Sequence, residues 1–438
     1  MFFQLFYIKP NVVKTFLSTL LCISTVNISF AVQTANVLTL EDVEQIAINR
    51  DFVVKSFLDK SSALQQESIA IDTLPDPKLK FGFLNYPDDT FKQNQEPMTQ
   101  KKIGIVQMFP KGDSLEIKSQ RAIILSDKNQ IQVIERKRKV RELSRKAWLE
   151  VYYWIHAKKI LDENRLLFND LVKITEGQYA AGKRRQVDYV QAQLELDLLN
   201  DKDFMFSEKE EIARAELAKW VGESYSKMTI SNKLTELHEN ITVLNNAEQN
   251  KSSINKKLLE HPKILLSQNK VRFNRKNVEL ARQDYKPSWS LDLSYSDREG
   301  NNPNGSERAN FVSAMVMVDI PLFTGNRQDK RVASKLKMVS ASKNKLSDML
   351  QVMYTKLEKS HTKLVWLKQR MDHYNKVLFP RAKQNSEAAL VAYQSDRSDF
   401  LSLIKARIIE FKTQLQFLRL NVDHVSTEAT LSYLLGDE

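Results

Sequence analysis

The chain has 438 residues, a formal net charge of +12, 42% hydrophobic residues and one cysteine, Cys22. A single cysteine excludes a framework of intramolecular disulfides. The positive charges are dispersed among acids rather than clustered with aromatic residues, so nucleic acid is not an expected partner.

The first 31 residues have the pattern of an export signal. Lys9 and Lys14 form a basic region, and the apolar run that follows ends at Phe30, close to the small residues Ser29 and Ala31. This order is typical of a secretory signal peptide. We therefore expect residues 1–31 to be removed on export, and the rest of the chain contains no stretch of about 20 apolar residues.

Four segments alternate apolar and polar residues, which predicts β-strands. The alternation is clearest in the fourth segment, where Val312, Ala314 and Val316 alternate with Ser313 and Met315. A soluble sheet has the same period, but about ten residues of apolar-out, polar-in strand are also typical of an outer-membrane barrel. Four strands cannot close a barrel alone, whereas three subunits with four strands each would supply twelve. The predicted segments are 79–86, 103–109, 289–296 and 311–322.

The segments between the strands predict helices that are too long for a compact domain. No glycine occurs between Gly112 and Gly177, and a helix over about 114–176 would be roughly 90 Å long. Its densest basic run, residues 136–139, is most simply a solvated helix face. An apolar row with seven-residue spacing predicts left-handed supercoiling of this helix against a neighbour. An ordinary helical bundle would bury the same positions. The row consists of Val140, Ala147, Trp154, Leu161 and Phe168.

Each half also predicts a tight turn between two long helices. Gly182 is expected to adopt a left-handed conformation that ends the first helix. The corresponding turn at 394–397 lacks glycine, and Asp396 is expected to take its place. Pro380 should bend the helix that leads into this second turn, or start a new one.

The two halves of the chain correspond over their whole length. The offsets between matched residues are 210, 213, 214, 214 and 214 for the pairs Pro77 and Pro287, Gly112 and Gly325, Tyr179 and Tyr393, Ala192 and Ala406, and Gly222 and Gly436. A period of this size exceeds that of ordinary solenoid repeats and indicates two large equivalent units. We expect a first repeat over 32–222, a connection over 223–252 and a second repeat over 253–438.

This duplicated order of strands and long helical hairpins resembles the TolC family of outer-membrane efflux channels. The resemblance rests on PLFTGNR after the fourth strand, on the Tyr179-to-Gly182 turn before VDYVQAQLEL, and on the second copy from Tyr393 to Ala406. It implies a mainly α fold with a membrane β-barrel: a homotrimer whose twelve-stranded β-barrel in the outer membrane continues into a periplasmic α-helical barrel. The connection over 223–252 would lie in the belt around the middle of that helical barrel.

The resemblance further implies a passive exit duct that contacts outer-membrane lipid, a periplasmic adaptor (membrane fusion protein) and an inner-membrane pump. It places adaptor contacts at the two turns, on Tyr179, Gly182, Lys183, Arg184, Tyr393, Asp396 and Arg397. Candidates for a periplasmic constriction are Asp188, Asp399, Ser402 and Lys405. The last two occupy positions where the family often has two aspartates, so Asp396 and Asp399 are candidates to replace them, and Lys405 would weaken or reverse the field of a carboxylate ring.

Residues 74–111 are most similar to the branch of this family that serves heavy-metal efflux, which favours heavy-metal cations as the cargo. A duct for drugs or for type I secretion is the alternative. A periplasmic coiled-coil scaffold is a further hypothesis, from a different functional class. The six histidines are scattered without metal-binding spacing, and neither a phosphate loop nor a G-x-S-x-G motif occurs. We therefore expect no enzyme activity, no metal site and no cofactor.

Overall fold

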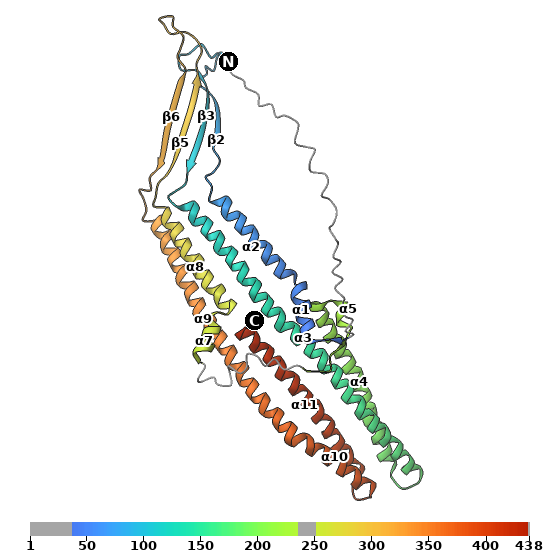
Figure 1. The fold of residues 1–438 in the computed structure, drawn as a ribbon. Coiled ribbons are helices and arrows are strands. Elements are labelled where there is room, and N and C mark those ends of the chain that lie inside the picture. Colours follow the sequence, from blue (N-terminus) through green and yellow to red (C-terminus); the bar gives the residue numbers. More distant parts are fainter. Residues whose placement is uncertain (1–36, 235–250, 437–438) are drawn as a thin grey trace, which may run out of the picture. The chain divides into compact units, whose positions relative to one another are not determined.

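The structure is a computed structural model that describes residues 37–234 and 251–436. The predicted signal peptide lies outside these ranges, and so do residues 235–250 of the predicted connection. Figure 1 shows four strands beyond one end of a set of long helices, and the two tight turns that connect paired helices at the other end. In the described part of the chain, no helix is long and apolar enough to cross a membrane.

The first half contains the longest helix of the described chain. The elements are β1 (Val37–Leu38), α1 (Leu40–Arg50), α2 (Phe52–Ile71), β2 (Lys78–Leu84), β3 (Gln100–Phe109), α3 (Ser114–Ala180), α4 (Gln186–Val221), α5 (Glu223–Ser226) and β4 (Thr229–Ile230). The helix predicted over 114–176 is confirmed and is 67 residues long. Local capping starts the shorter helices: Thr39 and Asp42 form a capping box at α1, and the Asp51 side chain accepts the Val54 amide at α2.

The second half repeats this order. Its elements are α7 (Lys251–Leu259), α8 (Pro262–Gln283), β5 (Ser288–Asp297), β6 (Phe311–Asp319), α9 (Gln328–His373), the π-helix η2 (Tyr374–Leu378), α10 (Phe379–Gln394) and α11 (Phe400–Leu435). The disturbance predicted at Pro380 is confirmed, because η2 lies directly before it and Pro380 stands in the first turn of α10. A proline has no N–H to donate and its ring crowds the carbonyl four residues earlier, which favours a wider turn there.

The four long strands form one antiparallel sheet in the order β2-β3-β5-β6, and the pairing of β3 with β5 joins the two halves of the chain. The predicted strands are confirmed with small shifts: β3 begins at Gln100 rather than at residue 103, and β6 ends at Asp319, before Pro321. One face of β5 carries Asp292, Ser294 and Ser296, which are buried, and the other carries exposed apolar side chains such as Leu293. The period-two alternation of the sequence therefore separates a polar face from an apolar one.

Gly104 in β3 allows a close approach of β5. A Cβ atom at this position would lie 2.9 Å from the Leu293 carbonyl oxygen and 2.9 Å from the Ser294 Cβ. Since the oxygen belongs to the backbone, it cannot move without disturbing the strand pairing. Gly104→Ala should therefore lower the free energy of unfolding by about 1–2 kcal/mol.

The measurement is thermal or denaturant unfolding of the full chain followed by far-UV circular dichroism. Gly82→Ala in β2 is the matched control, because the nearest atom to its new Cβ would be a Leu84 side-chain carbon at 3.7 Å. Equal destabilisation by the two substitutions would show that crowding at Gly104 is not the cause.

Much of the core lies along α3, which packs against α1, α2, α4, α8 and α11, while a further cluster of buried apolar residues lies among α7, α8, α9 and α11. The neighbours of α3 surround it, so α3 buries residues on several faces rather than on one stripe. The predicted seven-residue row is buried at Val140, Ala147, Leu161 and Phe168, while Trp154 is only partly buried. The row thus lies in the core.

The expectation that residues 136–139 form a solvated face is wrong for three of the four side chains. Arg136 pairs with Asp51 at 2.8 Å, and Lys139 pairs with Glu142 at 2.7 Å. The guanidinium of Arg138 lies against Gly436, 2.9–3.1 Å from where a Cβ of that residue would stand. Only Lys137 is exposed. The run lies where α3 is covered by its neighbours, which the spacing of charges along one helix does not reveal.

Candidate functional site

The two predicted turns adopt the expected conformations. Gly182 has φ +70° and Asp396 has φ +59°, so an aspartate occupies in the second turn the left-handed position that glycine occupies in the first. Aspartate is one of the few non-glycine residues that visit this region readily, because its short side chain can bond locally. The duplication therefore extends to backbone geometry at the ends of the hairpins.

Side chains connect the two turns directly. Arg184 of the first turn donates a hydrogen bond to the Tyr393 carbonyl at 3.2 Å, forms an ion pair with Asp396, and lies 4.7 Å from the centre of the Tyr393 ring. The Tyr393 hydroxyl donates to the Gln178 side-chain oxygen at 2.9 Å. One arginine thus holds the second turn against the first.

Five of the residues predicted to act at this end line one cavity of about 450 Å³, together with Arg185 and Phe400; they are Gly182, Lys183, Arg184, Asp188 and Asp399. Asp188 is buried and pairs with Arg185 at 3.3 Å. The other predicted residues are outside the cavity: Tyr179 stacks on Tyr189, while Arg397, Ser402 and Lys405 are exposed.

The two aspartates proposed to replace a carboxylate ring each have a local structural partner. Asp396 pairs with Arg184, and Asp399 is the N-cap of α11, where it accepts the Ser402 amide at 2.7 Å. Hydrogen bonds from the Ser402 hydroxyl and amide hold the pKa of the Asp399 carboxyl below its usual value. Asp399 therefore carries its charge at neutral pH while it caps the helix.

Arg184→Ala should loosen the contact between the turns. The substitution removes a charge-assisted hydrogen bond, an ion pair and a cation–π contact, of which the exposed ion pair contributes least. We expect amide hydrogen exchange in residues 394–397 to become roughly tenfold faster, equivalent to about 1–2 kcal/mol of local stability.

The readout is hydrogen–deuterium exchange of the full chain by mass spectrometry. Lys183→Ala, which removes the neighbouring exposed charge, is the control. Unchanged exchange in the second turn of Arg184→Ala would show that the arginine does not hold it.

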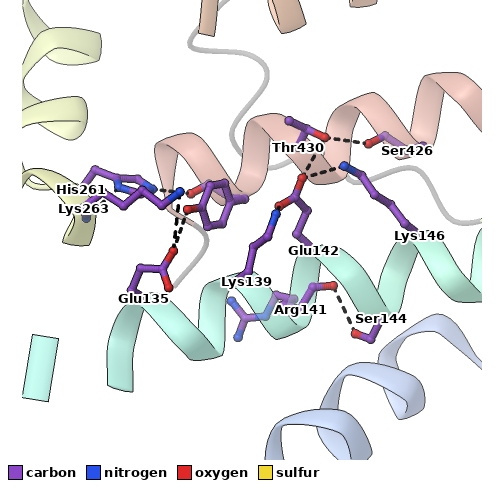
Figure 2. Close-up of polar contacts among 11 residues, drawn as sticks. Glu135, Lys139, Arg141, Glu142, Ser144, Lys146, His261, Lys263, Ser426 and Thr430 are labelled. Atoms are coloured by element: carbon purple, nitrogen blue, oxygen red, sulfur yellow. Dashed lines mark hydrogen bonds and ion pairs between the residues drawn. The ribbon is translucent and has the colours of Figure 1, made fainter. Parts of the chain in front are cut away.

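A second group of polar residues lies away from the turns, where α3 meets α8, α9 and the end of α11. We call it the belt cluster; its members are Glu135, Lys139, Glu142, Lys146, His261, Lys263, Lys356, Thr430 and Tyr433. Figure 2 shows Lys139 and Lys146 pointing at the Glu142 carboxylate, at 2.7 and 2.6 Å. Thr430 of α11 donates to the same carboxylate at 3.2 Å.

Glu142 is the most deeply buried carboxylate of the belt cluster, with 2% of its surface exposed. Burial opposes its ionisation, but the hydrogen bonds and charges of Lys139 and Lys146 outweigh burial and hold the pKa of Glu142 below its usual value. For Lys356 burial is the largest effect, and it lowers the pKa of the ammonium. The cluster therefore keeps one buried negative charge among several cations.

His261 connects the belt cluster to the start of α8. Its Nε2 donates to the Tyr433 carbonyl at 3.1 Å and its Nδ1 accepts the Lys263 amide at 3.2 Å, so the ring is the neutral Nε2–H tautomer. Burial and the nearby charge of Arg138 lower the pKa of His261 to about 4. The Tyr433 hydroxyl donates to Glu135 at 2.9 Å, and burial raises the pKa of the Tyr433 hydroxyl.

Sequence reasoning missed the belt cluster. Lys139, Glu142 and Lys146 have the i, i+3 and i, i+4 spacing of an ordinary surface ion pair on a helix. The available signal was the His261-Pro262 pair, since a capping residue before proline marks a helix start. Within residues 37–234 and 251–436, no group of three or more histidine, cysteine, aspartate or glutamate side chains could hold a metal ion.

No model of a protein family matches the chain. No curated protein sequence matches it either. Solved structures do match: a membrane protein from Pseudomonas aeruginosa has a TM-score of 0.77 at 13% identity, covering 91% of this chain and 90% of that one. The Campylobacter jejuni CmeC outer membrane channel has a TM-score of 0.73 at 12% identity, covering 91% and 85%.

The open state of the Neisseria gonorrhoeae MtrE outer membrane channel has a TM-score of 0.70 at 13% identity, covering 91% of this chain and 88% of that one. At such low identity these similarities show the fold. The chain therefore has the mainly helical fold, with its four-stranded sheet, that was expected from the sequence.

Proposed function

We propose that this chain is one subunit of a homotrimeric outer-membrane exit duct, which conducts cargo passively from a periplasmic adaptor and an inner-membrane pump to the exterior. The observation that carries the proposal is the four-stranded sheet. Within the described residues, β2 and β6 each pair on one side only, which leaves two open edges. Open edges of this kind are sites for pairing with another chain.

The apolar face of the sheet supports the same proposal. Large side chains on the edge strands are unusually exposed, including Phe81 at 73%, Phe83 at 69% and Val312 at 83%. An exposed apolar surface of this kind marks a contact with lipid or with another protein. Three copies that pair edge to edge would close the sheet, face these side chains toward outer-membrane lipid and enclose the polar face.

The far end of the long helices is then the site of adaptor contact. Lys183 and Arg397 are exposed at the two turns, and Tyr179 is 43% exposed. They stand beside Gly182, which has the left-handed conformation, on turns that Arg184 holds together. Asp188, Asp399, Ser402 and Lys405 would lie just behind them and border a periplasmic constriction.

The cargo proposed from the sequence is a heavy-metal cation, with drugs or the substrates of type I secretion as the alternative. The test is a susceptibility profile of a strain that lacks the gene, with complementation, across copper, silver, zinc, cobalt, cadmium and a drug panel. Selective metal sensitivity is the expected result. Sensitivity to drugs with normal metal tolerance would overturn the metal assignment and leave the duct standing.

A further inference from the structure

A cavity lined by cationic side chains lies where the helices meet the strands. It has a volume of about 620 Å³. Figure 1 shows α8 lying between α3 and α9 directly below the sheet, and α8 packs against both of these helices. Asn277 and Ala281 of α8 and Asp284, which directly follows this helix, line the floor of the cavity, and the two longer helices form its walls.

The charge of this cavity is strongly unbalanced. Five cationic side chains line it, against a single carboxylate, Asp284; the cations are Lys111, Lys118, Arg121, Arg331 and Lys335. Asp284 lies 3.5 Å from the Lys111 ammonium and 3.2 Å from the Arg331 guanidinium. The other three cations form no ion pair with any residue that the structure describes.

Arg121 is the most enclosed of these unpaired cations. It lies over the Phe273 ring at 5.1 Å, and burial lowers the pKa of its guanidinium. Its buried Nε has no hydrogen-bond partner among the described residues. A buried donor without a partner costs free energy, which an acceptor entering the cavity would offset.

The strand pairing shows on which face of the sheet this cavity opens. Phe109 of β3 pairs with Trp289 of β5, and the two rings stack on the apolar face with centroids 3.8 Å apart. Because side chains alternate along a strand, the next residues, Pro110 and Ser288, point to the opposite face. Both line the cavity. It therefore opens on the polar face of the sheet, the face that also carries Asp292.

We propose that this cavity binds small oxyanions, and that three copies of it form a cationic collar inside the duct which favours anions over cations. The collar rests on the proposed trimeric duct, whereas anion binding by one cavity does not. A pore lined by one sign of charge concentrates counter-ions and repels ions of its own sign. A bare divalent metal cation would be repelled here, so metal cargo would cross the collar as an anionic complex.

The first test measures binding of inorganic phosphate to the purified full-length protein at low salt, by phosphorus NMR titration. The variant is Lys118→Gln with Lys335→Gln, which removes one unpaired charge from each wall. Removing two charges that lie about 6 Å from the anion should weaken phosphate binding roughly tenfold. The control is Lys137→Gln with Lys359→Gln, which removes two exposed lysines from the same helices outside the cavity.

We expect saturable binding that weakens roughly tenfold in the first variant and is unchanged in the control. Absent binding, or equal weakening in both variants, would overturn the anion site. The second test measures reversal potentials in a potassium chloride gradient across a planar bilayer. Preference for chloride that falls in the first variant supports the collar.

The two tests separate the inference from the function on which the collar rests. A conducting protein that prefers potassium, with no change in the variant, overturns the collar and leaves the duct standing. A protein that binds phosphate at the cavity but never conducts overturns the duct and leaves the anion site standing.

Discussion

Glu142→Gln is expected to lower the free energy of unfolding by about 3 kcal/mol, because it removes the one buried negative charge that Lys139 and Lys146 share. Both ammonium groups are about one-third exposed, so they can turn partly toward water. That relief keeps the cost at the lower end of the range for breaking a buried ion pair. Thr430 would also lose a charged acceptor.

The measurement is denaturant unfolding of the full chain at pH 7, followed by tryptophan fluorescence. Glu387→Gln is the matched control, since its pairing with Lys383 at 4.0 Å is between two exposed side chains and should contribute less than about 1 kcal/mol. Because the folded pKa of Glu142 is depressed, its contribution is present above the unfolded pKa and is lost as pH falls through the folded pKa. A Glu142 variant no less stable than the control at pH 7 would contradict a central role for this carboxylate.

Acidification from pH 6.5 to about 4 is expected to cost the wild-type protein about 3 kcal/mol through His261 alone. Its folded pKa of about 4 lies below the unfolded value of 6.5, so over this window the unfolded chain binds a proton that the folded chain does not. Each pH unit in the window is equivalent to about 1.4 kcal/mol. Protonation would place a further positive charge beside Arg138, Lys263 and Lys356.

His261→Asn tests this directly, because asparagine is a good N-cap for α8 and does not titrate. The variant should lose some stability at pH 7 and recover relative to wild type as the pH falls, so that the difference between them changes by about 3 kcal/mol toward the variant. His373→Asn, at an exposed histidine of α9, should follow the wild-type curve. Parallel curves for His261→Asn and wild type would exclude His261 as the source of acid sensitivity.

The sequence was sufficient for features that depend on local chemistry. Long stretches without glycine or proline, and strict alternation in the strands, predicted α3 and the four strands because these patterns act through residues close in sequence. The left-handed position at Asp396 followed from its correspondence to Gly182. Pro380 predicted a disturbance of its helix but not the form that it takes, the π-helix η2.

The features that the sequence did not reveal depend on contacts between distant segments. Glu142 and Thr430 are far apart in the chain, and so are His261 and Tyr433. Spacing along one helix cannot show whether a charged side chain faces solvent or another helix, which is why residues 136–139 were misjudged. The cationic cavity likewise needs α8 to lie between α3 and α9.

Whether three copies of this chain close into a duct can be tested by single-particle electron microscopy of the full-length protein purified from the outer membrane in detergent. We expect particles with threefold symmetry and a continuous lumen, in which β2 of one subunit pairs with β6 of the next. A monomer or dimer whose β2 and β6 edges remain unpaired, or recovery of the protein from the soluble periplasmic fraction, would contradict it.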